Sequence, residues 1–323
     1  VGIFANPLTD LLEYEDFSRD FLKGTDPVGM TGCIDSEKVH FMSTFLGEKK
    51  VQLVVTYSEQ RAREIEEDYK LFCSQVYVIP PRDLIFFSAD LQGNAIIAER
   101  MKAFAALYQN EAKVIITTMD ALMSAAVPFE QLMSHVIKLK EGDELDLEKL
   151  KHDLTVMGYE RVGRVEEPGQ FTVHGGIADV YPLTMEVPVR IELWGDEIDT
   201  IRCFEPQSQR SMDQIECVSV FPAAEVIADD TARRRAAGMI QNELESQLAV
   251  FKKAKEPDKA KRLREETNRI LEALGEDVVL EAPDSYISYF YPRPVQLSEY
   301  FDEKNTLVFL DEPMRLKERG DGV

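Results

Sequence analysis

The sequence of 323 residues contains little cysteine or histidine and no long apolar run. The cysteines form no CxxC pair and are too few for a disulfide framework, so we expect free thiols in a reducing compartment. The histidines show no metal-ligand spacing, so no metal site is predicted. No apolar run reaches the roughly 18 residues of a membrane span. The opening VGIFANPLTD also lacks the features of a signal peptide, which predicts a cytoplasmic protein without membrane contact. The cysteines are Cys33, Cys73, Cys203 and Cys217.

Positive charge is also scarce. Lys and Arg number 37 against 59 Asp and Glu, a net charge of −22 that opposes broad attraction to nucleic acid. Any such contact is therefore expected at a local patch. The most basic interval, FKKAKEPDKAKRLREETNR (251–269), contains acidic residues throughout, and we interpret it as a solvated helix face. Contact with nucleic acid or with another domain stays open as an alternative.

The first of three segments, residues 1–127, alternates between helix and strand patterns. Apolar strands such as VQLVVTY (51–57) lie between amphipathic helices such as 59–72. Continuous apolar strands between helices predict a parallel sheet that is covered on both faces.

Two further segments follow. Residues 128–222 contain short strands of alternating polarity, with a hairpin signal at Gly195-Asp196, and predict an antiparallel α+β unit. Residues 223–323 are mostly helical and end in the strand pattern TLVFLDE (306–312). We expect this strand to rejoin the first sheet. The fold class is then α/β: a discontinuous parallel domain with an inserted antiparallel domain. The first residue is Val and the sequence ends LKERGDGV, so we interpret the chain as a fragment of a longer protein.

The stretch GMTGCIDSEK (29–38) resembles a phosphate-binding loop, G-x-x-x-x-G-K-[ST]. Gly29 and Ser36 match the first glycine and the final hydroxyl, and Gly32 lies between them. Ile34 and Asp35, however, replace the second glycine and the lysine. Lys38 comes three residues late, about 4.5 Å further along a helix. The loop is therefore predicted to be a degenerate, inactive nucleotide site in which Asp35 or Ser36 caps a helix.

The run VFLDEP (308–313) resembles the acidic strand end of nucleotide-driven motors. There the Asp binds Mg²⁺ and the Glu polarises water, roles that Asp311 and Glu312 would take here. Together with the altered loop they form a half-site without its lysine, which is not expected to hydrolyse ATP. The alternative is an ATP-dependent DNA helicase or translocase domain that uses Lys38 with this acidic pair.

Three runs carry a family resemblance: YERVGRVEEPGQFTVHGGIADVYP (159–182), PVRIELWGDEIDTIRCFEPQSQRS (188–211) and VFPAAE (220–225). In order with GMTG, VIITTMDALM and VFLDEP, they resemble the amino-terminal module of the bacterial transcription-repair coupling factor (Mfd) family. That module is similar to the excision-repair protein UvrB. The resemblance covers essentially the whole chain.

The resemblance implies a degenerate helicase-like (RecA-like) domain split by an inserted domain that binds UvrA. The module would be non-catalytic and would recruit UvrA to RNA polymerase stalled at DNA damage. In the family, RNA polymerase and DNA are bound mainly by downstream domains, which also use ATP and Mg²⁺. None of their motifs occurs in this chain, so no cofactor is expected here.

The resemblance also implies docking residues for UvrA. Arg161 matches the Y-E-R element, and His174 and Tyr181 are carried over with it; Arg164 is added because it lies nearby. His174 stands where related sequences have arginine in F-x-V-R-G, which removes a planar five-donor group. Other interpretations stay open. The arginines would be solvated or paired with neighbouring glutamates, His174 a surface strand residue, and Tyr181 a core residue.

The last two expectations concern a pair of glycines and a hairpin that UvrB has and this sequence lacks. Gly175 and Gly176 are expected at a bulge or a close backbone approach. The aromatic-rich hairpin with which UvrB separates DNA strands has no counterpart between VYVIPPRD (76–83) and IIAERMKAF (96–104). We therefore expect this module to recruit a partner and not to inspect DNA.

Overall fold

The computed structural model describes residues 8, 14–24, 26–82, 92–227, 229–275 and 286–321. They form two compact units. The first unit contains the described residues within 1–82, 102–124 and 296–323, and the second those within 92–101 and 125–295.

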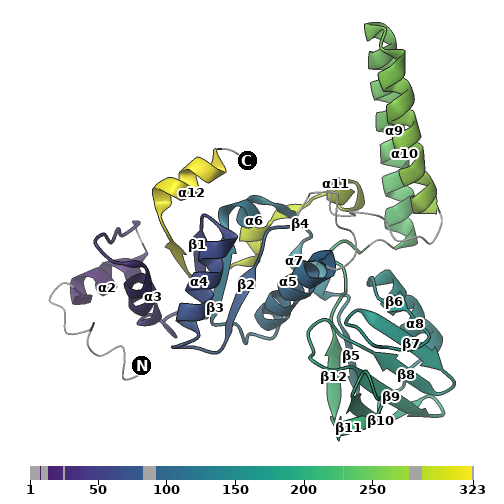
Figure 1. Ribbon diagram of the computed structural model, residues 1–323, viewed down its shortest axis with the longest axis horizontal. Coiled ribbons are helices and arrows are strands. Elements are labelled where there is room, and N and C mark those ends of the chain that lie inside the picture. The colour runs from purple at the N-terminus through teal and green to yellow at the C-terminus, as the bar shows by residue number, and fades with distance from the viewer. Residues whose placement is uncertain are drawn as a thin grey trace. The chain divides into compact units, whose positions relative to one another are not determined.

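The first unit is built on a four-stranded parallel sheet in the order β14-β1-β3-β2 (Figure 1). In β1 and β3 every residue is buried, as expected for strands covered on both faces. Val51 lies opposite Thr306, so the last strand does return to the first sheet, as the sequence predicted. The strands are β1 (Val51–Thr56), β2 (Val76–Ile79), β3 (Val114–Thr118) and β14 (Thr306–Leu310).

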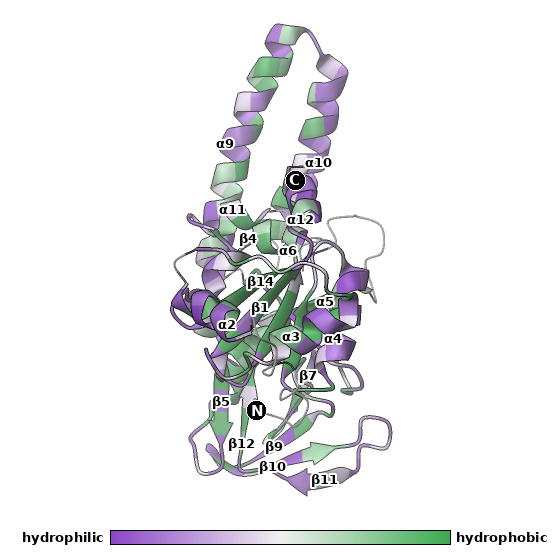
Figure 2. Cartoon of the chain, turned by 90° about the vertical axis from the view of Figure 1, so that its left-hand side faces the viewer, coloured by the Kyte–Doolittle hydropathy of each residue, from purple (hydrophilic) through white to green (hydrophobic). Residues whose placement is uncertain are grey.

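Helices pack on this sheet through apolar faces, and Figure 2 shows the strands as its most hydrophobic part. Phe17 and Phe21 of α2 contact Phe41 of α3 and Phe45, which lies just after that helix. Phe21 also contacts Phe309 of β14. This aromatic cluster ties the segment before the loop to the sheet. The helices are α2 (Tyr14–Lys23), α3 (Asp35–Ser43), α4 (Glu59–Tyr69), α6 (Met119–Met123), η2 (Leu297–Tyr300), α12 (Pro313–Gly320) and the second half of α5 (Gln92–Tyr108).

The second unit contains a six-stranded sheet in the order β11-β10-β9-β8-β7-β6. All its neighbours are antiparallel except β6 and β7, which confirms the predicted antiparallel α+β region. Leu150 and Leu154 of α8 (Leu147–Val156) belong to the core of its inner face. The strands are β6 (Glu160–Arg161), β7 (Gln170–His174), β8 (Ile177–Val180), β9 (Val189–Trp194), β10 (Glu197–Phe204) and β11 (Ser211–Gln214).

Two-residue turns join the central strands. Gly195-Asp196 connects β9 to β10 with Gly195 at a φ of 66°, so the predicted hairpin is confirmed. Gly175-Gly176 forms a second hairpin turn, because His174 pairs with Ile177. This is a turn and not a bulge. The expected close approach is present, since a Cβ on Gly176 would lie 3.4 Å from the Leu193 carbonyl oxygen.

The remainder of the second unit includes a long helical hairpin. The single predicted helical stretch is two antiparallel helices, α9 (Asp230–Ala254) and α10 (Pro257–Gly275), which lie side by side in Figures 1 and 2. The chain reverses at Lys255, whose φ of 56° ends α9 in the left-handed region. The other elements are β4 (Ala125–Ala126), α7 (Phe129–Met133), β5 (Ile137–Lys140), β12 (Cys217–Val220), α11 (Ile287–Phe290) and the first residue of β13 (Val295–Gln296).

The sequence predicted no membrane span, no metal site and no strand-separating hairpin. No helix in the described ranges combines the length and apolarity needed to cross a membrane. Within those ranges, no group of three His, Cys, Asp or Glu side chains could hold a metal ion. The prediction that a strand-separating hairpin is missing falls largely on residues 83–91, which lie outside the described residues.

Candidate functional site

The loop of residues 29–34 leads directly into α3, which begins at Asp35. The expected cap by Asp35 or Ser36 is wrong. Ile34 occupies the N-cap position, and its backbone N–H donates to the Glu37 carboxylate over 3.2 Å. Asp35 instead contacts two cations. Its carboxylate lies 3.5 Å from Lys38 Nζ and 3.3 Å from an Arg61 amino group.

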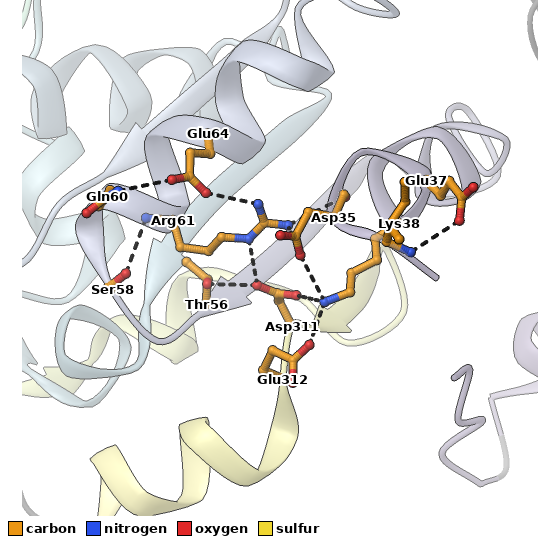
Figure 3. Close-up of polar contacts among 11 residues, drawn as sticks. Asp35, Glu37, Lys38, Thr56, Ser58, Gln60, Arg61, Glu64, Asp311 and Glu312 are labelled. Atoms are coloured by element: carbon orange, nitrogen blue, oxygen red, sulfur yellow. Dashed lines mark hydrogen bonds and ion pairs between the residues drawn. The ribbon is translucent and has the colours of Figure 1, made fainter. Parts of the chain in front are cut away.

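These residues belong to an ion-pair cluster that joins α3, α4 and the end of β14 (Figure 3). Lys38 Nζ lies 3.1 Å from Asp311 Oδ1 and 2.6 Å from Glu312 Oε1. Arg61 donates from Nε to Asp311 Oδ2 over 3.2 Å and also pairs with Glu64 at 3.1 Å. The sequence showed Asp311 and Lys38 as separate features, and the fold brings them into contact.

Burial makes Asp311 the centre of the cluster. Its side chain is 3% exposed, and Thr56 Oγ1 donates a third hydrogen bond to it over 3.1 Å. A buried carboxylate requires such partners, because an unpaired charge in the interior is costly. Burial lowers the pKa of Lys38, but hydrogen bonds to Glu312 and Asp311 outweigh that effect and raise it. Lys38 is therefore held as a cation.

Glu312 follows at a φ of 55°, in a region that costs a residue with a side chain about 1–2 kcal/mol. Pro313 then begins α12 at a position where proline suits a helix. The strained residue directs its carboxylate to Lys38, so the acidic strand end is engaged with a cation of its own chain.

The electrostatics of the cluster are unfavourable for a triphosphate. A groove of about 470 Å³ opens beside the loop, within the size range of ligand pockets. Its lining includes four carboxylates and a single arginine, whose guanidinium is already paired. Helix N-termini attract anions, but Asp35 and Glu37 occupy the first turn of α3. The four carboxylates are those of Asp35, Glu64, Glu67 and Asp68.

The other predicted site residues lie on the six-stranded sheet. Arg161 ends β6, is exposed, and stands opposite Phe171 of β7. Arg164 is also exposed, but its guanidinium pairs with Glu166 at 3.2 Å and donates to the Gln207 carbonyl oxygen. Arg161 is thus the more available of the two arginines for a partner.

Tyr181 and His174 occupy different environments. Tyr181 is 7% exposed, packs with Val165 and Phe204, and donates its hydroxyl to the Glu186 carbonyl oxygen over 2.6 Å. His174 is exposed at the far end of β7, three residues from Phe171, which is about 10 Å along a strand. The fold therefore places Arg161 and Tyr181 at one end of β7 and His174 at the other.

The position of His174 reveals residues that the sequence analysis missed. Ile177 lies opposite both His174 and Glu192, and Trp194 is the next residue of β9 on that face. Ile177 is 40% exposed and Trp194 84%. We call His174, Ile177 and Trp194 the turn patch. The alternation in VRIELW could have identified it, because Val189, Ile191 and Leu193 face the core and the residues between them face outward.

The outer face of the sheet beside the turn patch carries polar side chains that contact one another. Arg190 donates two hydrogen bonds to Asp179, over 2.8 Å and 2.7 Å, and its guanidinium lies 4.8 Å from the centre of the Phe204 ring. Asp179 is buried, so this two-bond contact satisfies its charge. An apolar patch beside an ordered polar surface is the composition that protein interfaces favour.

Comparison with known proteins finds two kinds of similarity, one for the six-stranded sheet and one for nearly the whole chain. Residues 137–225, which contain this sheet, match the model of the UvrB interaction domain. The chain is 30% identical over 320 residues to the transcription-repair-coupling factor of Bacillus subtilis (strain 168), covering 97% of this chain and 27% of that protein. It is 31% identical over 307 residues to that of Staphylococcus haemolyticus, covering 93% and 25%. The chain thus spans about a quarter of the length of these relatives. The resemblance seen in the sequence is therefore confirmed: residues 137–225 match the UvrB interaction domain, and nearly the whole chain is similar to part of the transcription-repair-coupling factors.

Proposed function

We propose that this chain is a non-catalytic recruitment module of transcription-coupled repair that binds UvrA through its six-stranded sheet. The observation that carries the proposal is the match of residues 137–225 to the UvrB interaction domain, because those residues form the sheet with its outward-facing side chains. In a longer protein, this contact would bring UvrA to RNA polymerase stalled at DNA damage. RNA polymerase and DNA would be bound mainly by other domains.

Two surfaces support docking at the sheet. The turn patch offers a nearly fully exposed tryptophan, and tryptophan and arginine are the residues most enriched among those that dominate binding energy. Arg161 offers an exposed arginine side chain at the other end of β7. Tyr181 packs with Val165 and Phe204 at this same end of β7, and only 7% of its surface is exposed.

The ion-pair cluster supports the absence of ATP hydrolysis in this proposal. A phosphate-binding loop needs a lysine free to neutralise the terminal phosphate. Lys38, the candidate substitute, already contacts Asp311 and Glu312, the acids that would hold Mg²⁺. An ATP-dependent helicase or translocase domain would have to break these contacts and expose Asp311. We therefore favour a binding role over that alternative, with no nucleotide or metal cofactor.

Calorimetric titration of the chain with UvrA from the same organism tests the proposal. Arg161→Ala is expected to weaken saturable binding at least about tenfold, which is 1.4 kcal/mol. Arg210→Ala is the matched control, because Arg210 is an exposed arginine of the same domain outside both docking surfaces.

Either of two results would contradict the proposal. One is a lack of UvrA binding by the unmodified chain. The other is equal weakening by Arg161→Ala and Arg210→Ala, which would mean that the arginine charge acts without a defined docking surface.

A further inference from the structure

The end of the helical hairpin where the chain reverses carries a concentration of positive charge. Residues 252–264, which we call the basic turn, contain seven Lys or Arg and two acidic residues, a net charge of +5 in a chain of −22. The remainder of the chain therefore carries −27. All seven cations are exposed, at the end of α9 and in the first half of α10.

Four of the seven cations make no ion pair with any described residue: Lys252, Lys253, Lys255 and Arg264. The other three have exposed partners on the same hairpin. Lys259 pairs with Glu256 at 3.0 Å, Lys261 with Glu265 at 3.9 Å and Arg262 with Glu266 at 2.9 Å. Exposed pairs contribute little to stability, so a stronger anion can replace these partners.

Helix stability explains only part of this charge. Lys252 and Lys253 lie in the last turn of α9, where cations favour the helix dipole. Lys259, in the first turn of α10, opposes that dipole. The pairs of Lys261 and Arg262 also place the cation before the acid, the weaker order on a helix. The fold itself therefore gains little from these residues.

We propose that the basic turn contacts the phosphate backbone of duplex DNA without reading its sequence. The cations lie within about 10 Å of the chain reversal, because Arg264 is the eighth residue of α10. A duplex carries a charge every 1.7 Å or so along its axis, which places several phosphates within that span. The acidic surface elsewhere does not prevent this contact, since charges beyond about 10 Å are largely screened at 0.1 M salt.

The composition of the basic turn favours a duplex over other polyanions. Proteins that hold single strands stack bases on aromatic side chains, and residues 252–264 contain none. The same residues contain no Asn or Gln, the side chains that read adenine by two hydrogen bonds. A protein partner would require an apolar centre, whereas Val250 is an isolated exposed apolar residue next to the basic turn. Two packed helices instead present a fixed array of cations.

Fluorescence anisotropy of a labelled duplex of about two helical turns tests the proposal. For about four phosphate contacts, log K should fall with log salt at a slope of about −3 to −4 between about 50 and 200 mM. Replacing the four unpaired cations (Lys252→Gln, Lys253→Gln, Lys255→Gln and Arg264→Gln) should weaken binding at least tenfold at the lower salt and make the slope shallower, since three paired cations remain.

A matched variant separates a local surface from total charge. Lys50→Gln, Lys113→Gln, Lys140→Gln and Lys149→Gln remove the same charge from exposed positions elsewhere and should retain binding. Circular dichroism and thermal melting confirm that both variants fold. The proposal is overturned by an absence of binding, by equal loss in the two variants, or by equal affinity for a single strand or polyglutamate. UvrA titration is independent of this surface, so the two proposals fail separately.

Discussion

Lys38 Nζ lies 3.1 Å from Asp311 Oδ1, although 273 positions separate the two residues. This contact joins the helix that follows the loop of residues 29–34, which resembles a phosphate-binding loop, to the acidic strand end. Both features suggested a nucleotide site in the sequence, and in the fold they neutralise each other. Arg61 of α4 completes the arrangement by pairing with the other oxygen of the Asp311 carboxylate.

Arg61 is expected to stabilise the first unit more than Lys38 does. Its side chain is 6% exposed against 21% for Lys38, and it pairs with buried Asp311. Arg61→Met should lower the free energy of unfolding by about 3 kcal/mol, and Lys38→Met by about 1 kcal/mol. Urea unfolding measures both, with Arg63→Met as the control on the same helix, because the Arg63 side chain is 43% exposed and pairs with Glu66 away from Asp311. Equal effects of Arg61→Met and Arg63→Met would contradict this assignment.

Millimolar ATP with Mg²⁺ is expected to leave the melting temperature unchanged. A ligand that binds only the folded state must raise that temperature, so a thermal shift assay detects binding directly. A reproducible upward shift, lost in Lys38→Met, would show that Lys38 serves a nucleotide after all.

Restoring the loop is expected not to create hydrolysis. Ile34→Gly with Asp35→Lys returns the glycine and lysine of the phosphate-binding pattern. Turnover also requires an arginine finger and correctly placed Mg²⁺ ligands, which this change does not supply. Phosphate release measures the outcome, and turnover above that of the unmodified chain would refute the prediction.

Trp194 is expected to matter for binding and not for stability. Its side chain is 84% exposed, so Trp194→Ala should change the free energy of unfolding by no more than about 0.5 kcal/mol. If the turn patch binds UvrA, the same change should weaken binding at least about tenfold. Met212→Ala, on β11 of the same sheet and 50% exposed, serves as the control. Unchanged UvrA affinity in Trp194→Ala would remove the turn patch from the interface.

Gly158 is expected to tolerate no side chain. At a φ of 91°, its Cβ would lie 2.8 Å from the Ala224 Cβ. Gly142 has a φ of 87° and open space around it, so it isolates backbone strain from crowding. Gly158→Ala should lower the free energy of unfolding by about 3 kcal/mol and Gly142→Ala by about 1 kcal/mol. Equal costs in a urea titration would mean that the contact with Ala224 adjusts freely.

The sequence determined most of the secondary structure and the fold class. Apolar continuity in 51–57 and alternation in VRIELW predicted the parallel and antiparallel strands, because each pattern follows from how many faces of a sheet are buried. The reversal at Lys255 was missed, since neither glycine nor proline occupies that position and Pro257 is well tolerated in the first turn of α10.

The sequence by itself also determined that residues 29–36 lack the lysine of the phosphate-binding pattern they resemble, and it carried the family resemblance that led to the UvrB interaction domain. Only the tertiary structure decided that Lys38 and Arg61 neutralise Asp311, that Tyr181 is buried, and that Trp194 lies on the same face of the sheet as His174. The physical reason is the same in each case. Burial and charge pairing depend on strand register and helix packing, which join residues far apart in the chain, whereas local patterns report only on neighbours.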